Sequence, residues 1–203
     1  MRIAIHLFGH LRTYKSTYKS FCKNIVEANL KNSSCIDIFI HTWDEMEGRS
    51  ASWHDANKAL RGISVTDQQI EELKQLYPNV KKIEVAKSID GNGGATSRQG
   101  VARLREEYQN ERHMEYDWVI ETRPDIYFYS PLIVKKFIDA VNHRELREYG
   151  LPGEDSCLFC GHNLFHRMHI AHPGHVCEGD IIYFYKPSHK AERVTVPIDY
   201  KLR

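Results

Sequence analysis

The chain has 203 residues, with 28 Lys and Arg against 27 Asp and Glu, and 41% of its residues are hydrophobic. This length suits one domain with a sizeable core, and a formal charge of +1 excludes the clustered cationic excess that a general nucleic-acid binder needs. No apolar stretch approaches the roughly 20 residues that span a bilayer, and no secretory signal opens the sequence, so we expect a cytoplasmic protein without a transmembrane segment.

Residues 1–44 predict a strand, a helix and a second strand. The apolar run 2–8 ends at Gly9 and is typical of a buried strand in a parallel sheet. Apolar residues at spacings near three and four predict an amphipathic helix over 12–30. A second apolar strand follows at 35–41 and is closed by the polar residues 42–44. This succession is one βαβ unit.

The middle of the chain predicts a loop, a helix and a short strand. Residues 45–63 are polar and mixed, so we expect a mobile loop there. Ser64 or Thr66 can cap a helix over 67–76, and the alternation at 82–86 predicts a strand.

A glycine-rich linker at 90–94 precedes the next predicted helix, which begins after Thr96 or Ser97 as its cap and runs to about 113. The apolar segment 117–128 is the clearest strand in the sequence, and the missing amide of Pro124 should break its ladder.

The remainder predicts a helix over 131–141, an aperiodic stretch over 143–177 and a final strand over 180–185. Strands alternating with helices in this way imply a three-layer, Rossmann-like α/β domain with a mainly parallel sheet. We interpret residues 1–203 as a single domain.

Ligands of open α/β sheets bind outside the carboxyl ends of the strands, which directs attention to residues 9–13, 41–44 and 123–125. Gly9 and Arg12 lie where the first predicted helix begins, and free amides with a guanidinium favour a diphosphate. The alternative is a helix cap with an exposed arginine. Neither a dinucleotide fingerprint nor a Walker sequence is present.

Asp125 follows the expected break of the ladder, where a carboxylate can hold Mg²⁺ or Mn²⁺ that bridges phosphate oxygens. Glu121 and Arg123 precede it at intervals of two, so all three side chains should leave the strand on one side. A structural pair of Arg123 and Asp125 is the alternative.

Two further strand-edge positions are candidates for ligand contact. The Trp43 ring can stack on a base and Asp44 can accept from a ribose hydroxyl, although core packing explains Trp43 equally well. Arg98 can reach a ligand at the sheet edge, whereas a solvated residue beside a helix cap is the alternative.

The sequence contains 12 His and 5 Cys, an odd number that suits reduced thiols or a metal site better than a disulfide framework. Cys157 and Cys160 have the two-residue spacer of adjacent thiolates on one Zn²⁺, which His175 and Cys177 can complete. Buried thiols and polar imidazoles of a loop are the alternative.

Three blocks, at residues 3–13, 37–44 and 116–125, resemble bacterial glycosyltransferase-like proteins of surface polysaccharide assembly, found in lipopolysaccharide or capsule loci. The resemblance implies a GT-A-like domain, with 1–130 binding a nucleotide-sugar and 143–180 forming an irregular loop on the acceptor side. The chain is short for this group, so its acceptor-binding part is either reduced or continues outside the sequence.

Under this resemblance, residues 123–125 resemble an Asp-x-Asp metal motif that retains only Asp125, and Arg123 partly replaces the cation as a diphosphate clamp. Asp180 or His175 is the expected base, and Asp125 lies at the leaving group. The predicted donor-binding residues are Gly9, His10, Arg12, Thr42, Asp44, Arg98 and Arg123.

The leading hypothesis is therefore transfer of a sugar from a nucleotide-diphosphate donor to a glycan or lipid-linked glycan acceptor, with peripheral association at the inner face of the membrane. A divalent cation (Mn or Mg) and zinc are the candidate cofactors. Two alternatives stay open. One is transfer of a phosphoryl-type group onto a sugar, and the other is a non-catalytic binding module stabilised by zinc.

Overall fold

The computed structural model describes residues 1–48, 55–89, 93–129 and 131–135, together with four short strands at 158–161, 182–185, 195–197 and 200–202. Of residues 55–57 and of those four strands only the backbone is described.

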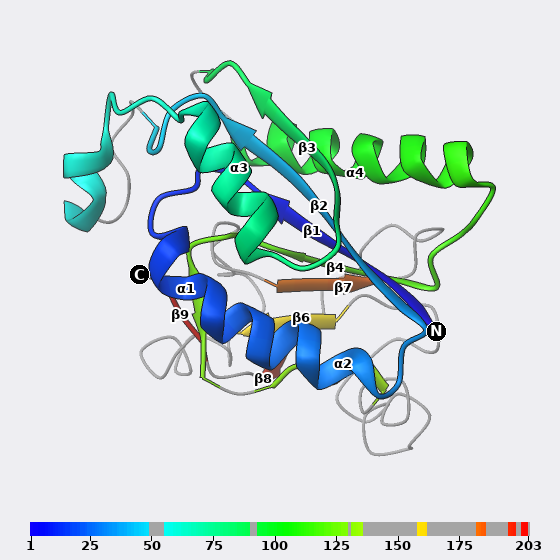
Figure 1. Ribbon diagram of the computed structural model, residues 1–203. Helices are drawn as coiled ribbons and strands as arrows, with labels where there is room; N and C mark the ends of the chain where they lie inside the picture. The colour runs from blue at the N-terminus through cyan, green and yellow to red at the C-terminus, as the bar shows by residue number, and fades with distance from the viewer. Residues whose placement is uncertain are drawn as a thin grey trace.

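A seven-stranded sheet forms the centre of the molecule (Figure 1), and its strand order is β3-β2-β1-β4-β7-β6-β8. The four strands of its first part are parallel to one another, whereas β7 is antiparallel to β4 and to β6. These strands are β1 (Arg2–Phe8), β2 (Cys35–Trp43), β3 (Val80–Ala86), β4 (Trp118–Thr122), β6 (Leu158–Gly161), β7 (Ile182–Tyr185) and β8 (Thr195–Pro197). The predicted α/β class with a mainly parallel sheet is confirmed for β1 to β4.

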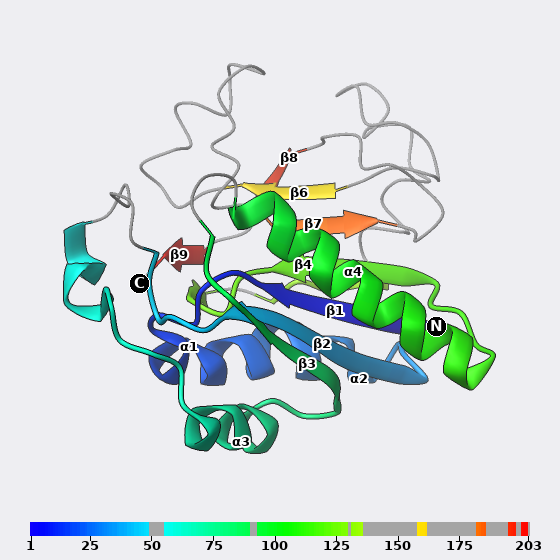
Figure 2. The ribbon, with the colours of Figure 1, turned by 90° about the horizontal axis from the view of Figure 1, so that it is seen from above.

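Helices cover both faces of the parallel strands. Figures 1 and 2 show α1 and α3 on one face and α4 on the other. The helical elements are α1 (Tyr14–Phe21), the π-helix η1 (Cys22–Glu27), α2 (Ala28–Leu30), the 3-10 helix η2 (Asp55–Leu60), α3 (Asp67–Leu76) and α4 (Gly93–Arg112).

The order in which the chain adds parallel strands to the sheet reverses beside β1. Strands β1, β2 and β3 follow one another outward, and α4 then crosses back so that β4 lies on the other side of β1. The register pairs Phe8 with His41 and Leu7 with Thr122, so β1, β2 and β4 end at a common edge. The point of reversal is therefore the carboxyl edge between β1 and β4.

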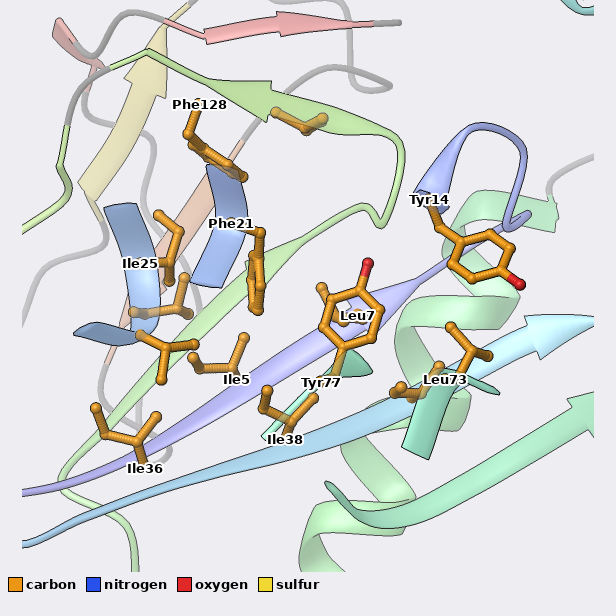
Figure 3. Close-up of a cluster of buried hydrophobic side chains, with 14 of the residues drawn as sticks. Ile5, Leu7, Tyr14, Phe21, Ile25, Ile36, Ile38, Leu73, Tyr77 and Phe128 are labelled. Atoms are coloured by element: carbon orange, nitrogen blue, oxygen red, sulfur yellow. The ribbon is translucent and has the colours of Figure 1, made fainter. Parts of the chain in front are cut away.

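The larger hydrophobic core lies between the sheet and the face that carries α1 and α3. Figure 3 shows Leu7 and Ile38 of the sheet together with Phe21 of the helical layer. Tyr77 stacks edge-on against Phe21 with ring centroids 5.4 Å apart. A smaller core on the other face packs α4 against β1, β2 and β4.

Buried polar side chains of α1 hold the segment that follows β4. The Thr17 hydroxyl donates to the Pro124 carbonyl at 2.5 Å, and the Ser20 hydroxyl accepts from the Phe128 amide at 3.1 Å. The backbone of this segment cannot pair within the main sheet because the ladder stops at Thr122, so helix side chains satisfy its polar groups.

The π-helical turn η1 extends this row of polar contacts. The Asn24 amide donates to the Phe128 carbonyl at 2.7 Å, and Asn29 both donates to the Leu132 carbonyl at 2.6 Å and accepts from the Val134 amide at 2.8 Å. A regular helix repeats its faces after three or four residues, whereas Asn24 and Asn29 are five apart. The extra residue of the π turn brings both to the same side.

The predicted helix over 12–30 is thus one rod of three parts that begins at Tyr14, and the predicted strand over 117–128 is divided. Its break at Pro124 is confirmed, because β4 ends at Thr122 and β5 (Ile126–Phe128) pairs instead with β9 (Tyr200–Leu202) in a second small sheet. The strand predicted over 180–185 is present as β7, but it is not the final strand, since β8 and β9 follow it.

Helix α3 has the predicted bounds, and Thr66 rather than Ser64 is its cap, in a reciprocal capping box with Gln69. Of the predicted helix over 131–141, residues 131–133 are not helical, 134–135 are, and the rest lies outside the described residues.

The segment predicted as a mobile loop over 45–63 has defined structure in its described part. Glu45, Met46 and Glu47 are buried, and backbone bridges join Glu45 to Ser64 and Glu47 to Arg61. The polar composition indicated a mobile loop because it does not reveal that the Glu47 carboxylate pairs with Arg12.

Helix α4 begins earlier than predicted, because Gly93 and Gly94 belong to it and not to a linker. Gly93 lies against the indole of Trp43, where a β-carbon would be 3.5 Å from the ring. Ser97 is not the cap of the helix; its hydroxyl is buried against β1 and β2. Within the described residues, no helix is long and apolar enough to cross a membrane.

We predict opposite effects of two glycine substitutions in α4. A β-carbon at Gly100 would lie 2.2 Å from Cδ2 of His41, which Ser97 holds in place, so Gly100→Ala should lower the free energy of unfolding by about 1–3 kcal/mol through overpacking. Gly94 is exposed and a β-carbon there meets nothing within 4 Å, so Gly94→Ala should raise it by up to about 1 kcal/mol. Urea unfolding measures both, and equal effects would contradict this account of the helix contact.

Candidate functional site

The carboxyl edge between β1 and β4 is the place where a sheet of this topology binds ligands, because the chain reverses there and leaves a crevice between the strand ends. Arg12 follows β1, and Arg123 and Asp125 follow β4. The structure therefore brings together residues that lie more than a hundred positions apart in the sequence.

A buried serine joins the ends of β1 and β2 to helix α4. The Ser97 hydroxyl accepts from the Gly9 amide at 2.8 Å, bonds to Nδ1 of His41 at 2.9 Å and donates to the His41 carbonyl at 3.1 Å. The His41 carbonyl also accepts from the Gly9 amide at 3.2 Å, so Gly9, His41 and Ser97 form one buried hydrogen-bond cluster. Gly9 has φ +96°, a left-handed conformation that glycine adopts without a steric penalty.

The carboxylate of Asp125 is fully buried between two guanidinium groups. Arg12 donates from Nη1 to Oδ2 at 3.0 Å, and Arg123 donates from Nε to Oδ1 at 2.9 Å and from Nη2 to Oδ2 at 2.6 Å. The Arg123 contact is bidentate, which is the strong geometry for this pair.

Arg12 holds a second carboxylate, that of Glu47. Its Nη2 lies 2.7 Å from Oε1 of Glu47 and its Nε lies 2.6 Å from Oε2. The Arg12 backbone has φ +44°, the left-handed region that side-chain-bearing residues rarely occupy. The two ion pairs offset that strain, and the four charges of Arg12, Arg123, Asp125 and Glu47 cancel.

The electrostatics of this cluster keep its members charged. Burial opposes ionisation of Asp125, but the guanidinium groups of Arg123 and Arg12 outweigh it and hold the pKa of this carboxyl below its ordinary value of 3.8. Burial likewise opposes the charge on Arg12, but Asp125 and Glu47 outweigh it and raise the pKa of Arg12.

Glu121 belongs to a different cluster, on the face covered by α4. Its carboxylate bonds to Nδ1 of His6 at 3.1 Å and accepts from Arg98 at 3.0 and 2.8 Å. The expectation that Glu121, Arg123 and Asp125 share one side is wrong, because the strand ends before Arg123 and its alternation stops there. Glu121 thus fixes Arg98 at the edge of the sheet. Burial lowers the pKa of His6, the other partner of Glu121.

His10 lies beside this edge as a neutral ring. Its Nδ1 donates to the Glu45 carbonyl at 2.9 Å, and burial lowers its pKa. Trp43 is 3% exposed and packs against His41, so the core-packing interpretation of this ring holds.

The remaining donor-site candidates after β2 take structural positions. Asp44 is half-buried and its carboxylate accepts from the Ser88 amide at 2.7 Å, a bond that lowers its pKa. Thr42 is fully buried, and its hydroxyl has no hydrogen-bond partner among the described residues.

The predicted base and zinc ligands lie beyond the described side chains. Cys160 is placed by its backbone within β6, whereas Asp180, Cys157, His175 and Cys177 lie outside the described residues. In the part of the chain where side chains are described, no group of three or more His, Cys, Asp or Glu is arranged to hold a metal ion.

A protein-family profile described as a domain of unknown function, DUF7796, matches residues 1–145. The chain belongs to this family. The DUF7796 match contains β1 to β4 and all the arginine and carboxylate contacts described above. No curated protein matches the sequence.

Two residues of this DUF7796 edge escaped sequence reasoning. Glu47 lies in a segment without periodicity, and nothing in its neighbourhood indicates that it would reach Arg12. Ser97 was predicted only as a helix cap after a glycine linker, so its contact with Gly9 and His41 was not predicted.

We predict that Asp125→Asn lowers the free energy of unfolding at pH 7 by about 3–5 kcal/mol, because it leaves two guanidinium groups with too little buried negative charge. The folded-state pKa of Asp125 is depressed, so its stabilisation is present above pH 3.8 and is lost as the pH falls through the lower folded-state value. The difference between the two proteins should therefore shrink in acid.

Urea unfolding over a pH series measures this difference. Glu71→Gln, which removes an exposed charge paired with Lys74 on α3, is the control and should change stability little. An Asp125→Asn protein as stable as the wild type at pH 7 would overturn the assignment of Asp125 as the anchor of the cluster.

Proposed function

We propose that this protein binds a nucleotide-diphosphate sugar at the carboxyl edge between β1 and β4 and transfers the sugar to a glycan acceptor. The observation that carries the proposal is the convergence of Arg12 and Arg123 on one buried carboxylate at the point where the sheet reverses. Two guanidinium groups held at a strand edge suit a small ligand that carries adjacent phosphates.

The resemblance to bacterial glycosyltransferase-like proteins supports the same place. Its three blocks, at residues 3–13, 37–44 and 116–125, contain β1, β2 and β4 or their ends. These strands are neighbours or next neighbours in the parallel sheet, and each block extends to the carboxyl edge. A GT-A-like form of the fold and a role in surface polysaccharide assembly, in the cytoplasm at the membrane, are parts of the proposal that rest on this resemblance.

Arg12 and Arg123 would act on the leaving group. Negative charge grows on the diphosphate as the bond to the sugar breaks, and fixed guanidinium donors stabilise that charge without reorganising. Asp125 positions both groups: it bonds to Arg123 through two nitrogens and to Arg12 through one. In this role Asp125 is a positioning residue.

The hydrogen bonds that Asp125 accepts leave its carboxylate unsuited to bind a Mn²⁺ or Mg²⁺ ion. Both of its carboxylate oxygens already accept hydrogen bonds from guanidinium groups, whereas a hard cation needs several free oxygen ligands. In this proposal Arg12 and Arg123, rather than a cation at Asp125, bind the diphosphate.

Three further predicted residues are part of the proposal. His10 precedes the Arg12 turn, and burial lowers the pKa of its ring, so it would present a neutral imidazole to the nucleotide. Arg98, held by Glu121, is a further candidate for phosphate contact. A general base, Asp180 or His175, would take the proton of the acceptor hydroxyl.

We expect UDP or GDP to bind the purified protein, and Arg123→Gln to weaken that binding at least tenfold, about the effect of one charge-assisted hydrogen-bond pair. Calorimetric titration measures the affinity, with and without Mn²⁺. Arg112→Gln is the matched control, since Arg112 ends α4 at the opposite edge of the sheet.

Incubation with nucleotide sugars tests the chemistry. Release of the nucleoside diphosphate with transfer of the sugar supports the proposal. Failure of every nucleoside diphosphate to bind the wild-type protein, or an Arg123→Gln protein that binds as tightly as the wild type, would refute it.

A further inference from the structure

The carboxylate of Glu47 occupies the position on Arg12 that an anionic ligand would take. It lies 2.6 and 2.7 Å from Nε and Nη2 of the guanidinium, and Nη2 donates a hydrogen bond to it. The Gly48 amide also donates to Oε1 of Glu47 at 2.8 Å. A guanidinium and a backbone amide therefore bind one anion together at this edge.

Arg61 lies beside Glu47 along the backbone, where the two residues form a bridge. Its Nε and Nη2 are buried without a hydrogen-bond partner among the described residues. Buried guanidinium nitrogens that lack an acceptor are costly.

The two carboxylates of the cluster are held with unequal strength. Asp125 is bonded by both arginines and lies in the segment that Thr17 anchors through the Pro124 carbonyl. Glu47 contacts one arginine and lies outside the helices and strands, in a segment held by a backbone bridge to Arg61 and by backbone hydrogen bonds of Met46 with Arg12 and Ile63. Glu47 is therefore the member that can leave while Arg12 stays in place.

We propose that Glu47 is a built-in competitor for the diphosphate, which displaces its carboxylate from Arg12 when it binds. This inference rests on the proposed function and assigns a regulation to the same site. With Glu47 in place the four charges cancel; once it leaves, Arg12, Arg123 and Asp125 carry a net charge of +1. Glu47 therefore prevents unpaired positive charge at the edge, and only a ligand that brings its own negative charge displaces it.

Glu47→Gln tests the competition, because it removes the charge and keeps the size of the side chain. With inorganic pyrophosphate and with UDP as probes, we expect the variant to bind about tenfold more tightly than the wild type in calorimetric titration, since one charged competitor has gone. Glu71→Gln, which removes an equal charge on the exposed face of α3, should bind like the wild type.

Thermal unfolding provides a second readout. Without ligand, Glu47→Gln should melt below the wild type because Arg12 has lost a buried partner, and pyrophosphate should raise its melting temperature more than that of the wild type. Glu47→Asp keeps the charge but shortens the reach to Arg12, so its affinity should lie between the two. The Glu47→Asp variant also tests the competition if Glu47→Gln fails to fold.

The possible outcomes separate this inference from the proposed function. If pyrophosphate and UDP bind the wild type, and neither variant binds more tightly, the competition is refuted while the nucleotide site stands. If neither probe binds the wild type or any variant, both are refuted.

Discussion

Burial of the Asp125 carboxylate is the constraint on which the carboxyl edge of the sheet depends. A fully buried carboxylate is tolerated only when it is paired and hydrogen-bonded, and its partners come from the ends of both β1 and β4. The side chain therefore fixes the separation of the two strand ends at the point where the chain reverses. Arg12 has a left-handed backbone conformation at this turn. Its Nη1 bonds to Asp125, while its Nε and Nη2 face Glu47.

Two buried polar systems support this edge from opposite faces. On one face, Thr17 and Ser20 of α1 hold the chain that follows the break at Pro124, so the helix positions Asp125 through the backbone. On the other, Ser97 of α4 binds Gly9 and His41 and aligns the ends of β1 and β2. Because each face is fixed by hydrogen bonds as well as by apolar packing, the strand ends are more sharply positioned than packing alone would make them.

The sequence predicted those elements whose local pattern agrees with their environment. Helix α3 has both a capping pair and an apolar stripe, and the buried strands β1 and β2 are nearly continuous apolar runs, so each was found. The start of α4 was missed because Gly93 and Gly94 serve packing against the sheet, which a local pattern does not reveal. In the site, strand order predicted that Arg12 and Asp125 lie at one edge, since parallel strands end together, but it did not predict the ion pair between them. The role of Glu47 depends on its contact with Arg12, which joins two irregular segments. The spacing of apolar residues in a sequence does not predict such a contact.

A diphosphate site made from arginine differs physically from one made around a cation. A bound cation leaves with its ligand or is lost to dilution, whereas Arg12 and Arg123 are part of the fold and stay charged over the range in which the protein is folded. Such permanent charge has to be neutralised whenever the ligand is absent, and a dry edge makes that need stronger because solvent screens it poorly. Asp125 meets the need by a permanent ion pair, while under the proposed competition Glu47 would meet it reversibly. The two carboxylates thus divide between them the two demands that an arginine-based site makes on its protein.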